Sequence, residues 1–163
     1  MRSAPPAQSA FDVIFVIDAS RNIGSAIFAQ AKFFVSQVIE HFDVDGRVAR
    51  VGACSYSARV VSSFNLNAYR TVANVKAAVM SLSYSGGNAN TAAALAYVRT
   101  SMLTPAAGDR TNVPNLIVIL TDGPSADPLG ARVSATSILI ASCREKCCIT
   151  RCRGKDVLSC TRA

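Results

Sequence analysis

Residues 13–18 read Val-Ile-Phe-Val-Ile-Asp, an uninterrupted apolar and largely β-branched run that stops at a carboxylate. Such a run predicts a strand covered on both faces, as in a parallel sheet. A short loop follows. From about residue 25 to residue 42, apolar side chains then recur at spacings of three and four, which predicts an amphipathic helix. Strand, loop and helix together form the first half of a βαβ unit.

A second uninterrupted run, Leu-Ile-Val-Ile-Leu at residues 116–120, stops at Thr121-Asp122-Gly123. Two strands and two helices are predicted between the runs. The strands, at 50–56 and 59–64, form a hairpin, and the helices cover 72–82, with Thr71 as N-cap, and 94–102. The second hairpin strand would run antiparallel at a sheet edge. The alternation of strands and helices predicts an α/β sandwich with a mostly parallel sheet.

Composition limits the classes of protein to consider. The chain has 163 residues, 50% of them apolar and 17% charged, so it can form one packed domain and is not disordered throughout. No apolar run approaches the roughly 18 to 20 residues that span a bilayer, so membrane insertion is not expected. The first residues lack the apolar stretch of a signal peptide, which predicts either an intracellular protein or a chain without its native start.

Charge and cysteine are concentrated at the C-terminal end. Residues 1–142 hold 11 basic and 8 acidic residues, whereas residues 143–163 hold 6 and 2, together with five of the six cysteines. Residues 1–10 are small, polar and contain proline, which is typical of a linker. We therefore expect an N-terminal arm at 1–10, a domain at 11–142 and an irregular, Cys-rich basic tail at 143–163.

The tail cysteines, at positions 143, 147, 148, 152 and 160, lack the Cys-x2-Cys pairs of common zinc sites and have no histidine nearby. Disulfides are favoured if the protein is secreted, with one tail cysteine left for Cys54 or another chain. Cys54 itself lies in an apolar strand and is expected to be a buried small residue. The basic tail could contact glycosaminoglycan or nucleic acid. No aromatic side chain is interleaved for base stacking, so a solvated tail is favoured and nucleic acid is not expected as a partner.

Two predicted strands end in an aspartate, Asp18 and Asp122. Ligands of open parallel sheets bind at the carboxyl ends of strands, where strand order reverses. If the two strands are neighbours, the carboxylates converge and repel unless a proton or a cation lies between them. Ser20, Asn22 and Thr91 add oxygen donors suited to Mg²⁺. The alternative is that both aspartates cap the helices that follow them.

Four motifs in this order and spacing resemble the von Willebrand factor A domain family. They are residues 11–24, Arg-Val-Gly at 50–52 with Tyr-Ser at 56–57, Gly-Gly-Asn-Ala-Asn-Thr at 86–91 with Ala-Leu at 94–95, and residues 113–123. The resemblance covers about residues 11–127 and is closest to the matrix type, as in collagen type VI, fibril-associated collagens and matrilins. It implies a Rossmann-like three-layer sandwich with one antiparallel edge strand and a metal-ion-dependent adhesion site at the top of the sheet.

The resemblance also implies a set of metal ligands, from which this chain departs. Asp18 and Ser20 match the family's Asp-x-Ser-x-Ser motif, but Asn22 replaces its second serine. Ala89 occupies the position of the family's threonine ligand, and Asp122 matches the last element. Thr91 aligns with a second family threonine that is not a ligand. Asn22 can supply a carbonyl oxygen, whereas Ala89 supplies none. We therefore expect a weak or absent Mg²⁺ site, at which Mn²⁺ or Ca²⁺ could substitute.

The same resemblance predicts an incomplete C-terminal part. Family members continue after Pro128 with further helices and strands, but only 35 residues follow here. Residues 136–141 could form a fifth strand, although little chain is left for a crossover helix before them. We expect the sheet to be incomplete at this end.

Enzymatic alternatives find little support. A haloacid-dehalogenase-like, Mg²⁺-dependent phosphohydrolase needs Asp-x-Asp after the first strand, where this chain has Asp18-Ala19-Ser20. The only histidine, His41, lies near the polar end of the first predicted helix, and no Gly-rich nucleotide loop occurs. The resemblance implies instead a secreted, non-enzymatic module of extracellular matrix or cell adhesion. Its partners would be matrix proteins, cell-surface receptors or other chains of a matrix assembly. An intracellular scaffold of the same fold is the alternative.

Overall fold

The computed structural model describes residues 9–121, 137–142 and 148–152. Its strands are β1 (Phe11–Asp18), β2 (Ala49–Tyr56), β3 (Val60–Phe64), β4 (Asn115–Thr121), β5 (Ser137–Ser142) and β6 (Cys148–Cys152). Its helices are α1 (Gly24–Ile39), α2 (Val72–Ser81), α3 (Thr91–Tyr97), the π-helical turn η1 (Val98–Met102) and the 3₁₀ turn η2 (Pro105–Ala107). None of the helices in these ranges is long and apolar enough to cross a membrane.

The strands form one sheet in the order β3-β2-β1-β4-β5-β6. The four inner strands are parallel, which confirms the predicted α/β class and mostly parallel sheet. β3 is antiparallel to β2 at one edge, as the sequence predicted. β5 lies parallel to β4, so the predicted fifth strand is confirmed, while the segment before it lies outside the described residues.

The other edge departs from expectation. The sequence predicted a single antiparallel edge strand and an irregular tail after residue 143, whereas Cys148–Cys152 form β6, antiparallel to β5. The physical reason is that the outer edge of β5 offers unpaired backbone groups, and a short segment containing Ile149 and Thr150 suits a strand. The limits of the arm, domain and tail otherwise stay predictions.

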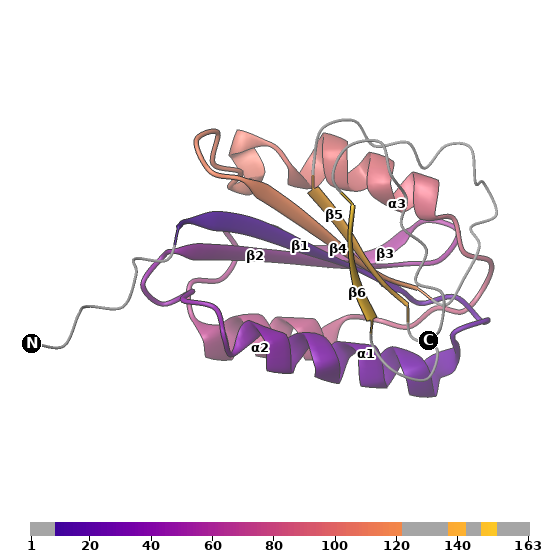
Figure 1. Ribbon diagram of the computed structural model, residues 1–163. Helices are drawn as coiled ribbons and strands as arrows, with labels where there is room; N and C mark the ends of the chain where they lie inside the picture. The colour runs from indigo at the N-terminus through magenta and orange to yellow at the C-terminus, as the bar shows by residue number, and fades with distance from the viewer. Residues whose placement is uncertain (1–8, 122–136, 143–147, 153–163) are drawn as a thin grey trace, which may run out of the picture.

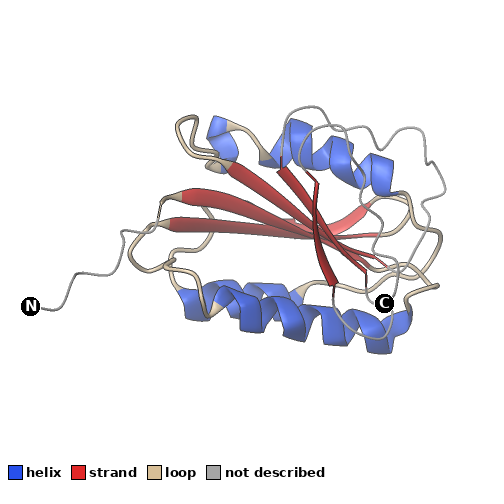
Figure 2. Cartoon of the chain, viewed as in Figure 1, coloured by secondary structure: helices blue, strands red, loops and turns tan. Residues whose placement is uncertain are grey.

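Helices cover both faces of the sheet (Figures 1 and 2). α1 and α2 lie on one face and α3 lies on the other. Alternate side chains of β1 enter different cores: Val13, Phe15 and Ile17 pack beneath α1 and α2, whereas Ile14 and Val16 pack beneath α3. This double burial explains why β1 reads as an unbroken apolar run.

Polar side chains set the ends of the helices. The Thr71 hydroxyl accepts from the Asn74 N–H at 3.3 Å, which confirms the predicted cap of α2. The single helix predicted at 94–102 is instead divided into α3 and the π turn η1, because the Leu103 N–H bonds back five residues to the Val98 carbonyl. The Thr100 hydroxyl also donates to the Ala96 carbonyl, a bond that competes with the regular helical ladder.

Cys54 lies in β2 and is fully buried, as expected. Burial raises the pKa of its thiol to about 12. The thiolate is the reactive form of cysteine, so Cys54 is chemically inert in the folded protein.

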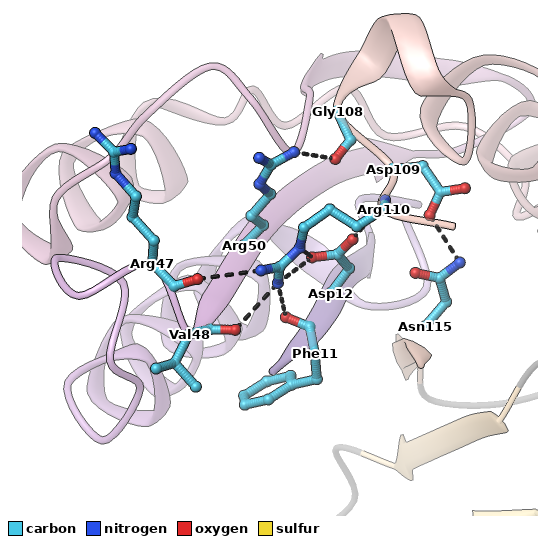
Figure 3. A network of polar contacts seen from close by, with 9 residues as sticks. All are labelled: Phe11, Asp12, Arg47, Val48, Arg50, Gly108, Asp109, Arg110 and Asn115. Carbon is cyan, nitrogen blue, oxygen red and sulfur yellow. Dashed lines mark hydrogen bonds and ion pairs between the residues drawn. The ribbon is translucent and has the colours of Figure 1, made fainter. Parts of the chain in front are cut away.

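An ion pair between Asp12 and Arg110 lies at the amino ends of β1 and β2 (Figure 3). The Asp12 carboxylate is buried, and the Arg110 guanidinium donates to its Oδ1 from Nε at 2.8 Å and from Nη2 at 2.6 Å. The same guanidinium donates to the carbonyls of Phe11, Arg47 and Val48. One side chain therefore ties the loop before β4 to both β1 and the segment before β2.

Candidate functional site

The carboxyl ends of β1 and β4 lie side by side. β1 pairs in parallel with β4, with Ile17 opposite Leu120, so these strands are neighbours. The chain leaves β1 through α1 toward β2 on one side, while β4 lies on the other side. Strand order thus reverses at this point, where parallel sheets bind their ligands. Asp18 ends β1 and Thr121 ends β4, whereas Asp122 lies outside the described residues.

Asp18 is held rigidly at this position. Its side chain is buried, with the residue only 1% exposed. Oδ1 accepts from the Ser20 N–H and Oδ2 accepts from the Thr121 hydroxyl, both at 2.9 Å. Each oxygen has a second lone pair, so the carboxylate keeps acceptor capacity for a cation.

Ser20 is completely buried, and its hydroxyl has no hydrogen-bond partner in the described part of the structure. A buried hydroxyl without a partner is costly, and such groups in native proteins call for a ligand, ion or water. Asn22 lies in the same loop and is exposed. The structure therefore brings Asp18 and Ser20 together at the end of β1 and places Asn22 at the solvent side of the loop.

Position 89, where the family carries a threonine ligand, holds an alanine. Ala89 is nearly buried and packs in the core beneath α3. The Thr91 hydroxyl is hydrogen-bonded to the Tyr56 hydroxyl at 2.9 Å. Thr91 is therefore engaged with β2 and does not take over the role of the missing threonine.

Tyr56 is a site residue whose role sequence reasoning missed. It ends β2 directly opposite Asp18 and is fully buried. Burial, and then the negative charge of Asp18, raises the pKa of its hydroxyl to about 12, against weaker opposing hydrogen bonds from Thr91 and Thr121. The sequence could have indicated this position, because a tyrosine at the carboxyl end of a strand next to β1 brings a polar group to the same edge of the sheet as Asp18.

Backbone hydrogen bonds join the two loops that frame the site. The Gly86 N–H donates to the Ala19 carbonyl and the Arg21 N–H donates to the Gly87 carbonyl, both at 2.9 Å. Gly86 and Gly87 have φ of 70° and 85°, a region that favours glycine. The Arg21 guanidinium adds a bond to the Asn88 side chain at 2.9 Å. The loops thus hold one another in place independently of any ligand.

The residues considered for catalysis in the sequence do not meet at the end of β1. Position 20, where a phosphohydrolase of the type considered above would carry its acid, holds a serine. α1 runs about 24 Å from the site end of β1, so His41, just beyond its far end, lies at the opposite end of the sheet. Within the described ranges no three His, Cys, Asp or Glu side chains form a metal cluster. Asp18 and Ser20 are the buried oxygen-bearing side chains at this end of β1, and Asn22 is exposed in the loop that follows.

Comparison with known proteins identifies the family. A sequence model of the von Willebrand factor type A domain matches residues 12–144. The chain belongs to this family. The A domain is 37% identical over 126 residues to the human (Homo sapiens) collagen alpha-1(XX) chain, an alignment that covers 77% of this chain and 10% of the collagen. It is 35% identical over 119 residues to human matrilin-1, covering 73% of this chain and 24% of matrilin-1. The chain thus spans a small part of the relatives it matches.

Solved structures agree on the fold. Proximal thread matrix protein 1 from the mussel byssus superposes with a TM-score of 0.71 at 22% identity, over 82% of this chain and 38% of that protein. A second structure of the mussel protein, described as having a zinc-occupied MIDAS motif, gives a TM-score of 0.64 over 73% of this chain and 30% of that protein, again at 22% identity. The predicted A-domain fold is therefore confirmed.

Proposed function

We propose that this A domain is a non-enzymatic protein-binding module of the extracellular matrix that binds its partners at the carboxyl ends of β1, β2 and β4. The relatives in the collagen and matrilin chains support the matrix setting. The position of Asp18 and Ser20 at the switch point of the sheet supports the choice of surface. Matrix proteins, cell-surface receptors or other chains of a matrix assembly are the partners that fit, and secretion is the location that fits.

The proposal includes a weak divalent-cation site. Asp18, Ser20, Asn22 and Asp122 would hold Mg²⁺, with Mn²⁺ or Ca²⁺ as substitutes. The observation that carries this is the buried Ser20 hydroxyl, which has no partner in the described residues and lies beside the rigidly held Asp18 carboxylate. When bound, the cation supplies a Lewis-acidic position for an anionic group of the partner.

The affinity for the cation should be low because the side chain at position 89 has no oxygen to offer. Ala89 contributes a methyl group to the core beneath α3. The nearest threonine hydroxyl in sequence, that of Thr91, is bonded to Tyr56. Water must therefore complete the coordination on this side, and protein ligands are fewer than in a full site.

Titration of the full chain with Mg²⁺ and Mn²⁺ by calorimetry and by thermal shift tests the site. The Ala89→Thr variant should bind at least about tenfold more tightly, because one more protein oxygen reaches the cation. The Ser20→Ala variant should lose binding while keeping its fold, since the hydroxyl has no bond to lose. No heat or thermal shift in either the natural chain or Ala89→Thr would contradict the cation site. A pull-down against matrix proteins, with Mg²⁺ and EDTA arms, tests the wider proposal separately.

A further inference from the structure

A groove of about 410 Å³ lies beside β3, and its lining residues include none of the proposed cation ligands. It is lined by residues 59–63, from the β2–β3 turn and β3, and by Ala93 and Tyr97 of α3. Val60, Val61 and Ala93 supply apolar surface, and Ser63 and Tyr97 supply hydroxyl groups. The Tyr97 and Ser63 hydroxyls lie 3.1 Å apart, so the groove wall on the α3 side is joined to the strand.

β3 leaves one edge of the sheet open. Within the described residues it pairs only with β2, so its outer backbone groups have no strand partner. Val61 lies at the register irregularity opposite Ser55 and Tyr56 and is 37% exposed. No proline, lysine or acidic residue interrupts Val60–Phe64. Open edges of this kind accept an extended peptide as an additional strand.

The charged residue among those that line the groove is basic, Arg59. Residues 46–108, which include β2, β3, α2 and α3, contain six basic residues and no acidic one. The ion pairs in the described part of the chain are Lys76–Glu40 and Arg110–Asp12, so Arg59 at the mouth of the groove is not neutralised. A positive edge of a sheet attracts acidic partners and repels basic ones.

We infer that this groove binds an extended acidic segment of a partner protein, which adds a strand to the outer edge of β3 and places carboxylates beside Arg59. Alternate apolar side chains of the segment would pack on Val60, Val61 and Ala93. The chain's own ends do not fit, because residues 1–10 contain an arginine and no acid and residues 143–163 carry six basic residues against two acidic ones. A second copy would bring its own basic edge. This surface is distinct from the proposed cation site.

The test uses fluorescence anisotropy of the full chain in EDTA with a labelled peptide of alternating Glu and Val. Controls are the matching Lys-Val peptide and the Glu-Val peptide N-methylated at alternate residues, which cannot pair along a strand. The Glu-Val peptide should bind, more weakly as salt rises, and both control peptides should bind at least about tenfold less tightly. Because EDTA removes any cation, binding here stands whether or not the cation site exists.

Charge reversal at one position gives the matched variant test. Arg59→Glu should weaken Glu-Val binding about tenfold, because an attractive contact becomes repulsive. Arg70→Glu makes the same change at an exposed arginine outside the groove and should weaken it less than about threefold. The inference is overturned by equal effects of the two variants, by undiminished binding of the N-methylated peptide, or by no binding below about 1 mM. A heparin fragment that competes while N-methylation has no effect would indicate a general polyanion surface instead.

Discussion

Replacing Arg110 by methionine should destabilise the domain by about 3–5 kcal/mol, the cost typical of leaving one partner of a buried ion pair alone. The structure places this case in that range because the Asp12 side chain is fully buried and loses both guanidinium bonds. Only the Arg110 backbone N–H, which donates to Asp12 Oδ2 at 3.0 Å, remains. The carbonyls of Phe11, Arg47 and Val48 lose a donor as well.

Two other arginines provide controls. Arg50→Met removes one bond, from Nη1 to the Gly108 carbonyl at 2.6 Å, and should cost about 1.5 kcal/mol. Arg70→Met changes an exposed side chain and should stay within about 0.5 kcal/mol of the natural chain. The double variant Asp12→Asn/Arg110→Met removes the buried charge while keeping an acceptor for the backbone N–H of residue 110, so it should be more stable than Arg110→Met alone.

Urea unfolding, followed by far-ultraviolet circular dichroism, measures these differences. With a slope near 2 kcal/mol/M, Arg110→Met should lower the midpoint by about 1.5–2.5 M. A shift no larger than that of Arg50→Met would refute the reasoning, because Asp12 would then not depend on its partner. A double variant less stable than Arg110→Met would refute it too, since the penalty could not come from an isolated charge.

Two further predictions concern a glycine and a tyrosine. Gly108→Ala should lower the free energy of unfolding in urea by about 2 kcal/mol or more, because φ is 95° and an added Cβ would lie 2.7 Å from the Asn67 backbone N and Cβ. Gly24→Ala, where φ is 75° but the space is open, should cost about 1 kcal/mol. Equal costs for the two variants would contradict the steric argument. When absorbance is followed at alkaline pH, one tyrosine should titrate near pH 12, and Tyr56→Phe should remove this step. The fold raises the pKa of the Tyr56 hydroxyl from 10 to about 12. The contribution of this hydroxyl to stability is therefore complete below pH 10 and is lost as the pH rises toward 12. The Tyr56→Phe variant should not show this loss of stability between pH 10 and 12.

Much of the fold could be predicted because its signals are local. β1 and β4 are buried on both faces, so their sequences are unbroken apolar runs, and α2 begins at a threonine cap that is visible in the sequence. β6 could not be predicted, because a short segment becomes a strand there only by pairing with β5. The change from α3 to the π turn at Val98 depends on hydrogen-bond geometry that spacing does not reveal.

The site was predictable in part for the same reason. The positions of Asp18 and Ser20 follow from the end of an obvious strand. That the Ser20 hydroxyl is buried without a partner, and that Tyr56 lies beside Asp18, are facts of packing between strands. The Asp12–Arg110 pair joins residues 98 positions apart, and in the sequence Asp12 is simply a charge near the start of a strand.

The bonds that join the two site loops run mainly through main-chain atoms of Ala19, Arg21, Gly86 and Gly87. Main-chain bonds do not depend on which side chains the neighbouring positions carry, apart from the glycines that need positive φ. Side chains facing the site can therefore be exchanged without unfolding the loops that display them. An alanine at position 89 fits this separation of framework from ligand set. We expect such a domain to lose or regain affinity for a cation by single substitutions, while its architecture stays unchanged.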